Sequence, residues 1–559
     1  MSLGSLEGTA IGEALNCQPE NVEFGTGDCR LDIASFLEQK KLLPDCLSPE
    51  PLTEDSLTEG KSPEINDNTR LIDLFGEYKR LLTAICRSIY ISDPENSVLV
   101  IHAPTSPRFE WNRLSEEKKG SYIKQVSEKE LSQLKSELEE TSILSLAKCN
   151  LTDGDLAQLL LIFPHLNILK INNNKLTTLP PLPKSLVELD VSHNKLTELE
   201  INGPTRLSVV KANNNQIKVL NEYPDTQKLD LSNNELTTVP EVIPPGMDNL
   251  DLSNNKINNS KLLVQGIDLS SLKIDLSGNK LTDFTLGKDN QSQKIGKPIF
   301  LDVLNLSENM LNNFPKIPTD LRIALLDLSN NQIREVGKGA LDIVNQVKLG
   351  NNQLTAFPSI SCGTIASHMH LDGNPLGSID VPEGTGGSLQ VLTLSNCGIS
   401  EVDNLPRGLT FLDLSHNKLV EFPGIILSML KLESLSLANN KISSVNHCRT
   451  IPGLGKLTFL DLSHNKLTLV PGFLSALELR ELHLEGNKGL KVNYEALCVL
   501  KNVLRGSQGC QLKIDYAVLT SSQVYSLADV EDEQSRRGIN SSLSLIDSEG
   551  KSYLRRLLS

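Results

Sequence analysis

The chain has 559 residues, of which 4% are aromatic, and it carries a formal net charge of −15 at pH 7 with a pI of about 5.2. A surface with this excess of acid repels phosphates, which excludes nucleic acid as a general partner. The first 29 residues contain no Lys, no Arg and no apolar run, and no stretch is long enough to cross a bilayer, so we expect a cytoplasmic protein with no secretory signal and no membrane span.

The region before the first repeat has two parts. Residues 1–69 are predicted to be an N-terminal segment that ends in an acidic linker, and residues 70–140 a helical cap or small module. Apolar residues keep helical spacing over 70–90, and SVLVIHAP at 97–104 has the composition of a strand. Because the first coil of a solenoid must be shielded from water, we interpret 70–140 as a cap, with an independent binding module as the alternative.

A unit of the form LxxLxLxxNxL recurs along residues 141–493. Its Asn, replaced twice by Cys, marks sixteen copies at an average interval of roughly 22 or 23 residues. The marker positions are Cys149, Asn174, Asn194, Asn215, Asn234, Asn255, Asn279, Asn309, Asn331, Asn352, Asn374, Cys397, Asn417, Asn440, Asn465 and Asn487.

The spacing of apolar residues and Asn in the repeated unit predicts the structure of each coil. Alternating apolar residues in LxL indicate a short strand with one buried face, and equivalent strands stack into a parallel sheet over a leucine core. The amide of the marker Asn can both donate to and accept from backbone groups that the following turn leaves unpaired. The sequence therefore predicts an α/β solenoid over 141–493, curved into a horseshoe with the parallel sheet on its concave side.

The segments that return from one strand to the next are expected to be extended. Six copies place Pro six residues after the marker, and Pro disfavours a full helix. These prolines are Pro180, Pro240, Pro315, Pro358, Pro423 and Pro471. The longest interval contains an additional polar stretch, residues 287–298, which we expect to form a loop on the convex side.

With these motifs the chain resembles the leucine-rich-repeat superfamily over residues 141–493. LTTLPPLPKSLVELDVSHNKLTEL at 176–199 is similar to the short, Pro-containing repeats of secreted bacterial effectors, the YopM and IpaH group. The superfamily resemblance implies a rigid scaffold that binds proteins, and the subgroup resemblance implies action in the cytosol of a host cell. The ligase domain of the IpaH group has a Cys-x-Asp motif, which this chain lacks, so a ubiquitin ligase of that kind is disfavoured.

After the repeats, YEALCVLKNVL at 494–504 predicts a helix. Together with CQLKIDY at 510–516 it is expected to close the last coil, as a C-terminal cap over 494–517. Residues 518–559 are polar and rich in Ser, and are predicted to be a flexible tail that serves as a secretion signal or a regulatory segment.

No motif for nucleotide binding, metalloprotease, hydrolase or kinase chemistry is present, so the sequence implies no cofactor and no enzyme. The predicted function is non-catalytic protein recognition on the concave face. Two alternatives remain open: a regulatory subunit of a phosphatase or kinase, and an enzyme whose activity lies in residues 1–140. The oligomeric state stays undetermined.

The outward-facing strand positions are the candidate partner-binding residues. The position between the two leucines of LxL is often Asp, and consecutive carboxylates would attract a basic partner, although Asp is also generic there. The position two residues earlier holds exposed apolar residues, which make a better interface core than charges alone. The candidates are Asp230, Asp251, Asp275, Asp413, Asp461, Val391, Phe411 and Phe459.

One further constellation suggests a metal site. His368, His370 and Asp372 alternate with Met369 and Leu371 in SHMHLDGN, so all three polar side chains should emerge on the concave face. Two imidazoles and a carboxylate are a ligand set found at zinc and iron sites. The alternatives are a pH-sensitive contact and an ordinary polar contact.

Overall fold

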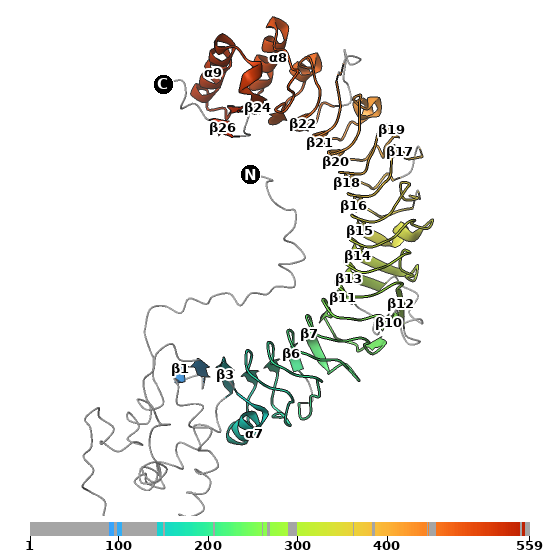
Figure 1. The fold of residues 1–559 in the computed structure, drawn as a ribbon, viewed down its shortest axis with the longest axis vertical. Helices are drawn as coiled ribbons and strands as arrows, with labels where there is room; N and C mark the ends of the chain where they lie inside the picture. The colour runs from blue at the N-terminus through green and yellow to red at the C-terminus, as the bar shows by residue number, and fades with distance from the viewer. Residues whose placement is uncertain are drawn as a thin grey trace, which may run out of the picture. The chain divides into compact units, whose positions relative to one another are not determined.

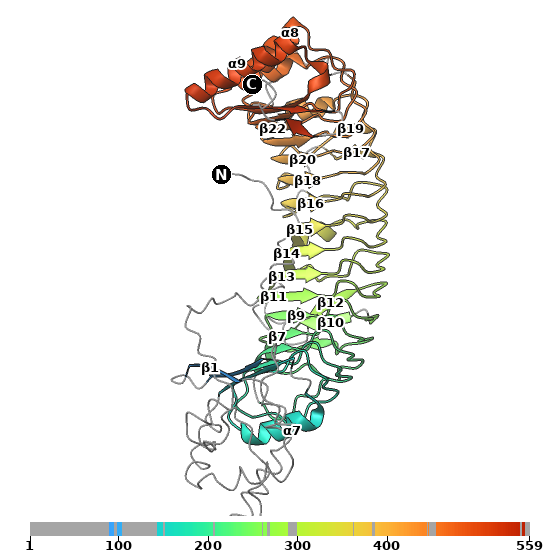
Figure 2. The same cartoon turned by 60° about the vertical axis from the view of Figure 1, so that its left-hand side comes forward.

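The computed structural model contains two compact units, Met1–Asn259 and Ser260–Ser559, and each is treated by itself (Figures 1 and 2). The structure describes residues 89–93, 98–102, 142–148, 151–204, 207–259, 261–264, 269–288, 299–361, 363–382, 386–443, 445, 454–547 and 551–553. None of the helices in this part of the chain has the length and apolar character that a membrane span requires.

Unit 1 contains a sheet whose strands are parallel except for the first. The sheet comprises β1 (Ile89–Asp93), β2 (Val98–His102), β3 (Ile143–Ala147), β4 (Ile168–Lys170), β5 (Glu188–Asp190), β6 (Leu207–Lys211), β7 (Thr226–Asp230) and β9 (Asn249–Asp251). β1 is antiparallel to β2, and β8 (Val242–Ile243) lies outside this sheet. Helix α7 (Asp153–Ile162), which the sequence analysis did not predict, lies on the side opposite the strands (Figure 1).

Of the residues before the predicted repeats, the structure describes only the strands β1 and β2, so the N-terminal predictions can be compared with the structure only there. The strand predicted at 97–104 is confirmed as β2, and it pairs in parallel with β3, so the sheet begins before the first predicted repeat. The helix predicted at 70–90 is wrong for its last two residues, which begin β1. The rest of that helix, the segment 1–69 and most of the predicted cap lie outside the described residues.

Unit 2 continues the same design, with its parallel strands on the inner side of a curved stack (Figure 1). They are β11 (Leu269–Asp275), β13 (Ile299–Asn305), β14 (Leu321–Asp327), β15 (Val344–Lys348), β16 (His368–His370), β18 (Val391–Thr393), β20 (Phe411–Asp413), β21 (Ser434–Ser436), β22 (Phe459–Asp461), β23 (Glu481–His483), β24 (Gln511–Asp515) and β25 (Ser542–Ile546). The last strand, β26 (Ser552–Tyr553), is antiparallel to β25. The predicted parallel-sheet solenoid is thus confirmed.

The return segments of unit 2 are mostly extended, as the prolines predicted. Two short parallel pairs form there: β10 (Lys261–Val264) with β12 (Thr285–Lys288), and β17 (Ser378–Asp380) with β19 (Glu401–Asn404). Four 3-10 helices also form there: η4 (Ala340–Ile343), η5 (Gly424–Ser428), η6 (Gly472–Ala476) and η7 (Tyr516–Val518). Of the predicted convex loop, residues 287–288 end β12 and 289–298 lie outside the described residues.

The marker asparagines hold adjacent coils together. The Asn194 Oδ1 accepts from the backbone N–H of Leu176 at 3.1 Å, and its Nδ2 donates to the carbonyl oxygens of Ile171 and Val191, both at 3.0 Å. The same pattern recurs along both units, and the described markers are all buried. Each amide therefore satisfies backbone groups of two coils, which confirms the predicted role of this residue.

The residue before the marker adopts a left-handed conformation, which the sequence analysis missed. Its φ is 54° at His193, 55° at Asn233 and 65° at Gly278. Asn and Gly tolerate this region far better than β-branched residues do. This explains the recurrent Asn-Asn, His-Asn and Gly-Asn pairs. The chain turns sharply at the first residue of each pair, and the turn directs the side-chain amide of the marker Asn into the interior of the coil.

The C-terminal region is more ordered than predicted. The predicted helix is confirmed as α8 (Tyr494–Leu504), capped by the Asn493 side chain. The flexible tail is wrong for most of its length, because α9 (Ser521–Arg536) packs on α8 and β25 adds a strand to the sheet. α9 starts with a capping box between Thr520 and Gln523, which satisfies free N–H groups at its start.

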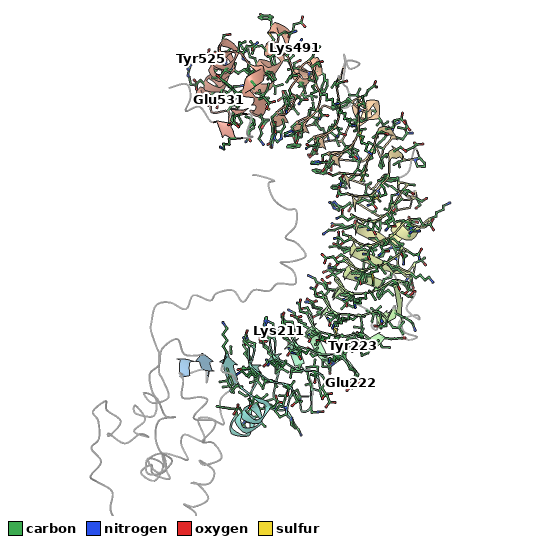
Figure 3. The ribbon with its side chains drawn as sticks, viewed as in Figure 1. Lys211, Glu222, Tyr223, Lys491, Tyr525 and Glu531 are labelled. Carbon is green, nitrogen blue, oxygen red and sulfur yellow. The ribbon has the colours of Figure 1, made fainter. Side chains whose placement is uncertain are left out.

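Figure 3 shows side chains filling the space between the strands and the return segments. In unit 1, Lys211 extends on the strand side, whereas Glu222 and Tyr223 lie on the side of the return segments.

Candidate binding surface

Two rows of side chains face outward on the concave sheet of unit 2. The first row consists of Val303, Leu325, Gln346, His368, Val391, Phe411, Ser434, Phe459 and Glu481, which pair in this order across adjacent strands. The second row lies two residues later and consists of Asp275, Asn305, Asp327, Lys348, His370, Thr393, Asp413, Ser436, Asp461 and His483. Between the rows, the buried leucines fix both in place.

The aspartates of the second row have a structural task that the sequence analysis did not predict. The Asp413 Oδ1 accepts the backbone N–H of Ser415, and the Asp461 Oδ1 that of Ser463, each at 2.8 Å. The same bond occurs at Asp190, Asp230, Asp251, Asp275 and Asp327, each to the Ser two residues later. Each carboxylate therefore caps the turn after its strand, which accounts for the LDLS motif without a partner.

These aspartates differ in how available they are. Asp275 is buried and accepts from the Asn305 amide at 2.9 Å; Asp327 is buried and lies 3.4 Å from the Lys348 ammonium. Asp413 is half-buried and has no ion-pair partner among the described residues. Burial raises its pKa, despite hydrogen bonds from Ser415. The predicted row of consecutive carboxylates is thus interrupted, and Asp413 is the more exposed of the two unit 2 aspartates, Asp275 and Asp413, that have no cationic partner among the described residues.

In unit 1, the corresponding row contains both positive and negative side chains. It reads Lys170, Asp190, Lys211, Asp230 and Asp251 across paired strands. Burial raises the pKa of Asp230, although hydrogen bonds from Ser232 and the charge of Lys211 oppose this. Lys170 also lies 3.5 Å from the Glu188 carboxylate. This face is a mixed-charge surface and not a purely acidic one.

Phe411 and Phe459 lie in the first row on either side of Ser434. Both are half-buried, as is Val391, the neighbour of Phe411 on the other side. The Phe459 ring meets the His483 ring edge-on, with centroids 5.4 Å apart. The structure thus brings the predicted apolar residues Val391, Phe411 and Phe459 onto one rigid surface beside Asp413 and Asp461.

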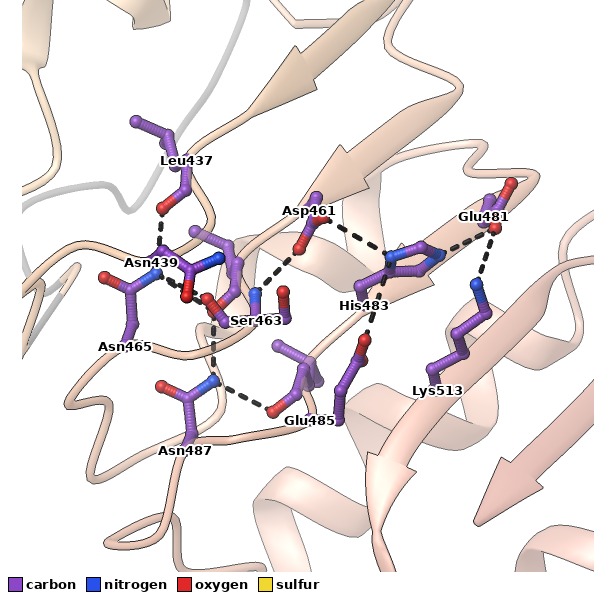
Figure 4. Close-up of polar contacts among 12 residues, drawn as sticks. Leu437, Asn439, Asp461, Ser463, Asn465, Glu481, His483, Glu485, Asn487 and Lys513 are labelled. Atoms are coloured by element: carbon purple, nitrogen blue, oxygen red, sulfur yellow. Dashed lines mark hydrogen bonds and ion pairs between the residues drawn. The ribbon is translucent and has the colours of Figure 1, made fainter. Parts of the chain in front are cut away.

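A charged cluster surrounds His483 at the end of this surface (Figure 4). The His483 Nε2 lies 2.6 Å from the Glu481 Oε1, and its Nδ1 lies 3.5 Å from the Asp461 Oδ2 and 4.0 Å from the Glu485 Oε1. The Lys513 ammonium is 3.3 Å from Glu481. Three carboxylates therefore share two cationic groups.

The cluster favours a protonated imidazole. Burial opposes the charge on His483, but hydrogen bonds to Asp461 and Glu481 raise its pKa overall. Burial likewise opposes ionisation of Asp461 and Glu481, and hydrogen bonds from His483 hold both pKa values below their ordinary range. Burial raises the pKa of Glu485, whose Oε2 is buried without a hydrogen-bond partner.

The predicted metal ligands are not arranged as a metal site. Both oxygens of Asp372 are used, one by the Thr393 hydroxyl and one by the backbone N–H of Ser395. Because Thr393 donates to Asp372, it accepts from the His370 Nδ1, 3.1 Å away, while the His368 Nδ1 contacts the Ser367 hydroxyl. Within the described ranges, no group of three or more His, Cys, Asp or Glu side chains could hold a metal ion.

Three members of the His483 cluster were missed from the sequence: Glu481, Glu485 and Lys513. Glu481 occupies the first-row position of β23, and Lys513 pairs with His483 across β24. Their positions in the repeat register could have identified them, but the strand containing Lys513 was interpreted as part of a cap.

Comparison with known proteins places the repeats in a wider group. A family model described as a leucine rich repeat matches residues 407–467, the segment that contains Phe411 and Phe459. Mouse Podocan is 30% identical over 388 residues, which cover 63% of this chain and 61% of Podocan. Chicken Lumican is 30% identical over 238 residues, 39% of this chain and 61% of Lumican. The matches span about three fifths of these relatives' length.

A likeness to solved structures is also present. The structure of YopM, a leucine-rich effector protein from Yersinia pestis, is 22% identical, with a TM-score of 0.42 over 72% of this chain and 95% of that one. This is a likeness of fold alone.

Proposed function

We propose that this chain, which belongs to the leucine-rich-repeat superfamily, is a non-catalytic scaffold that binds a protein partner on the concave sheet of unit 2. Its repeats form a scaffold suited to protein–protein interaction. The sheet supplies a rigid surface, so little side-chain or backbone entropy is lost when a partner docks.

The observation that carries the proposal is the row of Val391, Phe411 and Phe459. These apolar side chains stay partly exposed on adjacent or nearly adjacent strands, although the core beneath them is already filled by leucines. Exposed aromatic residues flanked by charged groups are typical of binding hot spots. The polar His483 cluster then forms one rim of the surface.

The test is the double variant Phe411→Ala with Phe459→Ala in the full chain. Cross-linking first identifies the partner, and the Kd of the purified pair is then measured for wild type and variant. We expect the variant to weaken binding at least about tenfold, or about 1.4 kcal/mol, with an unchanged melting curve.

The matched control is Phe300→Ala, since Phe300 is 59% exposed and lies outside the first row. If the double variant binds as tightly as the control, the partner docks elsewhere and the proposal fails.

We propose the cytosol of the protein's own cell as the compartment. Cys397, Cys498 and Cys510, the cysteines within the described residues, form no disulfide, and this fits a reducing environment. The other option is the cytosol of a host cell, as for a translocated effector, and the matches to mouse and chicken proteins lend that role no support. Fractionation of cells that express the tagged chain decides the compartment.

A further inference from the structure

We use the word slot for the strip of sheet surface between Phe411 and Phe459, whose central residues are small and polar. Ser434 lies between them in the first row, and Ser436 lies between Asp413 and Asp461 in the second. Strands in a sheet are about 4.8 Å apart, so each pair of flanking side chains is separated by roughly 10 Å at its base. The two side chains between these flanking residues are small hydroxyls, so neither is bulky enough to fill the space between the phenyl rings.

The slot combines two chemistries at one place. Its walls are two phenyl rings, whose faces attract cations. Its far edge holds two carboxylates, Asp413 and Asp461. Asp372, whose charge acts on Asp413, adds to the negative field there. The cations that offset this charge, His483 and Lys513, lie on the β23 and β24 side, so the β18 and β20 side has an excess of acid.

From this arrangement we infer that the slot between Phe411 and Phe459 receives one arginine side chain of the protein partner. A guanidinium is planar and can stack on a phenyl ring, and its donors match a carboxylate better than those of an ammonium do. An arginine lying over Ser434 and Ser436 lies between the two rings and can pair with Asp413, while Asp461, which is already held by Ser463 and His483, adds to the negative field. The inference rests on the proposed function and specifies the chemistry of its partner.

Asparagine is a suitable replacement for testing the carboxylates. Asn305 occupies the same second-row position in β13, and its Oδ1 accepts from the Ser307 backbone N–H at 3.1 Å and from the Ser307 hydroxyl at 2.8 Å. Asp413→Asn and Asp461→Asn can therefore keep the turn cap while they remove the charge, and Asp461→Asn also removes the carboxylate that faces His483.

The experiment measures binding of three labelled peptides, hexa-arginine, hexa-lysine and hexa-citrulline, to the full-length protein by fluorescence anisotropy. We expect hexa-arginine to bind more tightly than hexa-lysine, and neutral hexa-citrulline not to bind. Both double variants, Phe411→Ala with Phe459→Ala and Asp413→Asn with Asp461→Asn, should weaken hexa-arginine binding about tenfold. The controls Phe300→Ala and Asp190→Asn should leave it unchanged.

Equal affinity for hexa-arginine and hexa-lysine, or unchanged affinity in both double variants, would overturn the inference in favour of diffuse attraction to an acidic surface. Sedimentation of the wild type alone adds a further outcome. Self-association that the phenylalanine variant abolishes would mean that a second copy occupies the slot.

The result is separable from the test of the proposed function. If the partner's affinity depends on the two phenylalanines but survives replacement of every arginine at the partner's interface, the arginine slot is wrong and the scaffold function stands. If the partner's affinity does not depend on the phenylalanines, the function proposed for this surface is wrong, and the arginine inference that rests on it is wrong as well.

Discussion

Asn417 shows how a single side chain serves two coils. Its Oδ1 accepts from the backbone N–H of Ile399, and its Nδ2 donates to the carbonyl oxygens of Leu394 and Leu414. It also accepts from the N–H of Cys397, the residue that replaces the marker one coil earlier. The Cys397 thiol itself donates to the Leu371 carbonyl at 3.2 Å, so the substituted coil keeps a weaker version of the ladder.

Leu414 provides the residue-scale test of the core. It is fully buried at an inward LxL position, and Leu414→Ala should leave a cavity that lowers the free energy of unfolding by about 2–5 kcal/mol. Urea unfolding of both proteins checks this. Val420→Ala is the control, because Val420 is 54% exposed. Coincident unfolding curves for wild type and Leu414→Ala would show that the repeat register is wrong.

His483 predicts a pH dependence of stability. Its pKa is raised in the folded protein, so the stability it contributes is complete below the unfolded value of 6.5 and is lost as pH rises through the folded value. The pKa values of Asp461 and Glu481 are lowered, so their contribution is present above the unfolded carboxyl values of 3.8 and 4.5 and is lost at lower pH. The cluster should stabilise the fold most in mildly acidic solution.

The measurement compares wild type with His483→Gln by urea unfolding from pH 5 to pH 9. The stability difference should be on the order of 1 kcal/mol near pH 5.5 and shrink toward pH 9. His165→Gln, at an exposed position after α7, is the control. A difference that grows with pH would contradict the protonated imidazole.

The second-row aspartates show that the local sequence motif does not determine how exposed each carboxylate is. Asp275 and Asp413 occur in near-identical contexts, yet Asp275 is buried against Asn305, whereas Asp413 is only half-buried. Their neighbours are residues on adjacent coils about 20–30 positions away, so availability depends on the stacking register and not on the local sequence.

At the scale of elements, α9 shows why the polar composition of residues 518–559 led to the wrong prediction of a flexible tail. It is polar overall, but Val524, Leu527 and Val530 lie on one face and are buried. The Gln534 amide and the Ser541 hydroxyl both donate to the Leu504 carbonyl at the end of α8. A narrow apolar face suffices there, since the helix packs on α8 and β25 with one side and leaves the other side in water.

Truncation after Val518 should therefore destabilise unit 2, since it removes α9 and β25. Because burying each aliphatic side chain is worth about 1.5–3 kcal/mol, we expect a loss of several kcal/mol, measured by urea unfolding. Leu527→Ala is the milder version, and Tyr525→Ala, on the exposed side of the same helix, is the control. A truncated chain that unfolds with the wild type would restore the flexible-tail interpretation.

For the whole molecule, the repeat was the most informative feature of the sequence. It predicted the parallel strands, the buried leucines, the amide ladder and the placement of Phe411 and Phe459 on one surface. The His483 cluster was missed, because its other members lie at positions 461, 481, 485 and 513 and the strand containing Lys513 was interpreted as part of a cap and not as a further repeat. Only stacking brings them together.

The antiparallel strands β1 and β26 affect whether further strands can add to the edges of the parallel sheet. A parallel stack offers a free row of hydrogen-bonding groups at each end, to which another chain could add and so build a filament. Within the described residues, β1 is the first strand of unit 1 and β26, which is only two residues long, is the last strand of unit 2. Because each runs against the strand beside it, an incoming coil meets the wrong polarity. A further coil stacked in the orientation of the repeats would therefore run antiparallel to β1 or to β26.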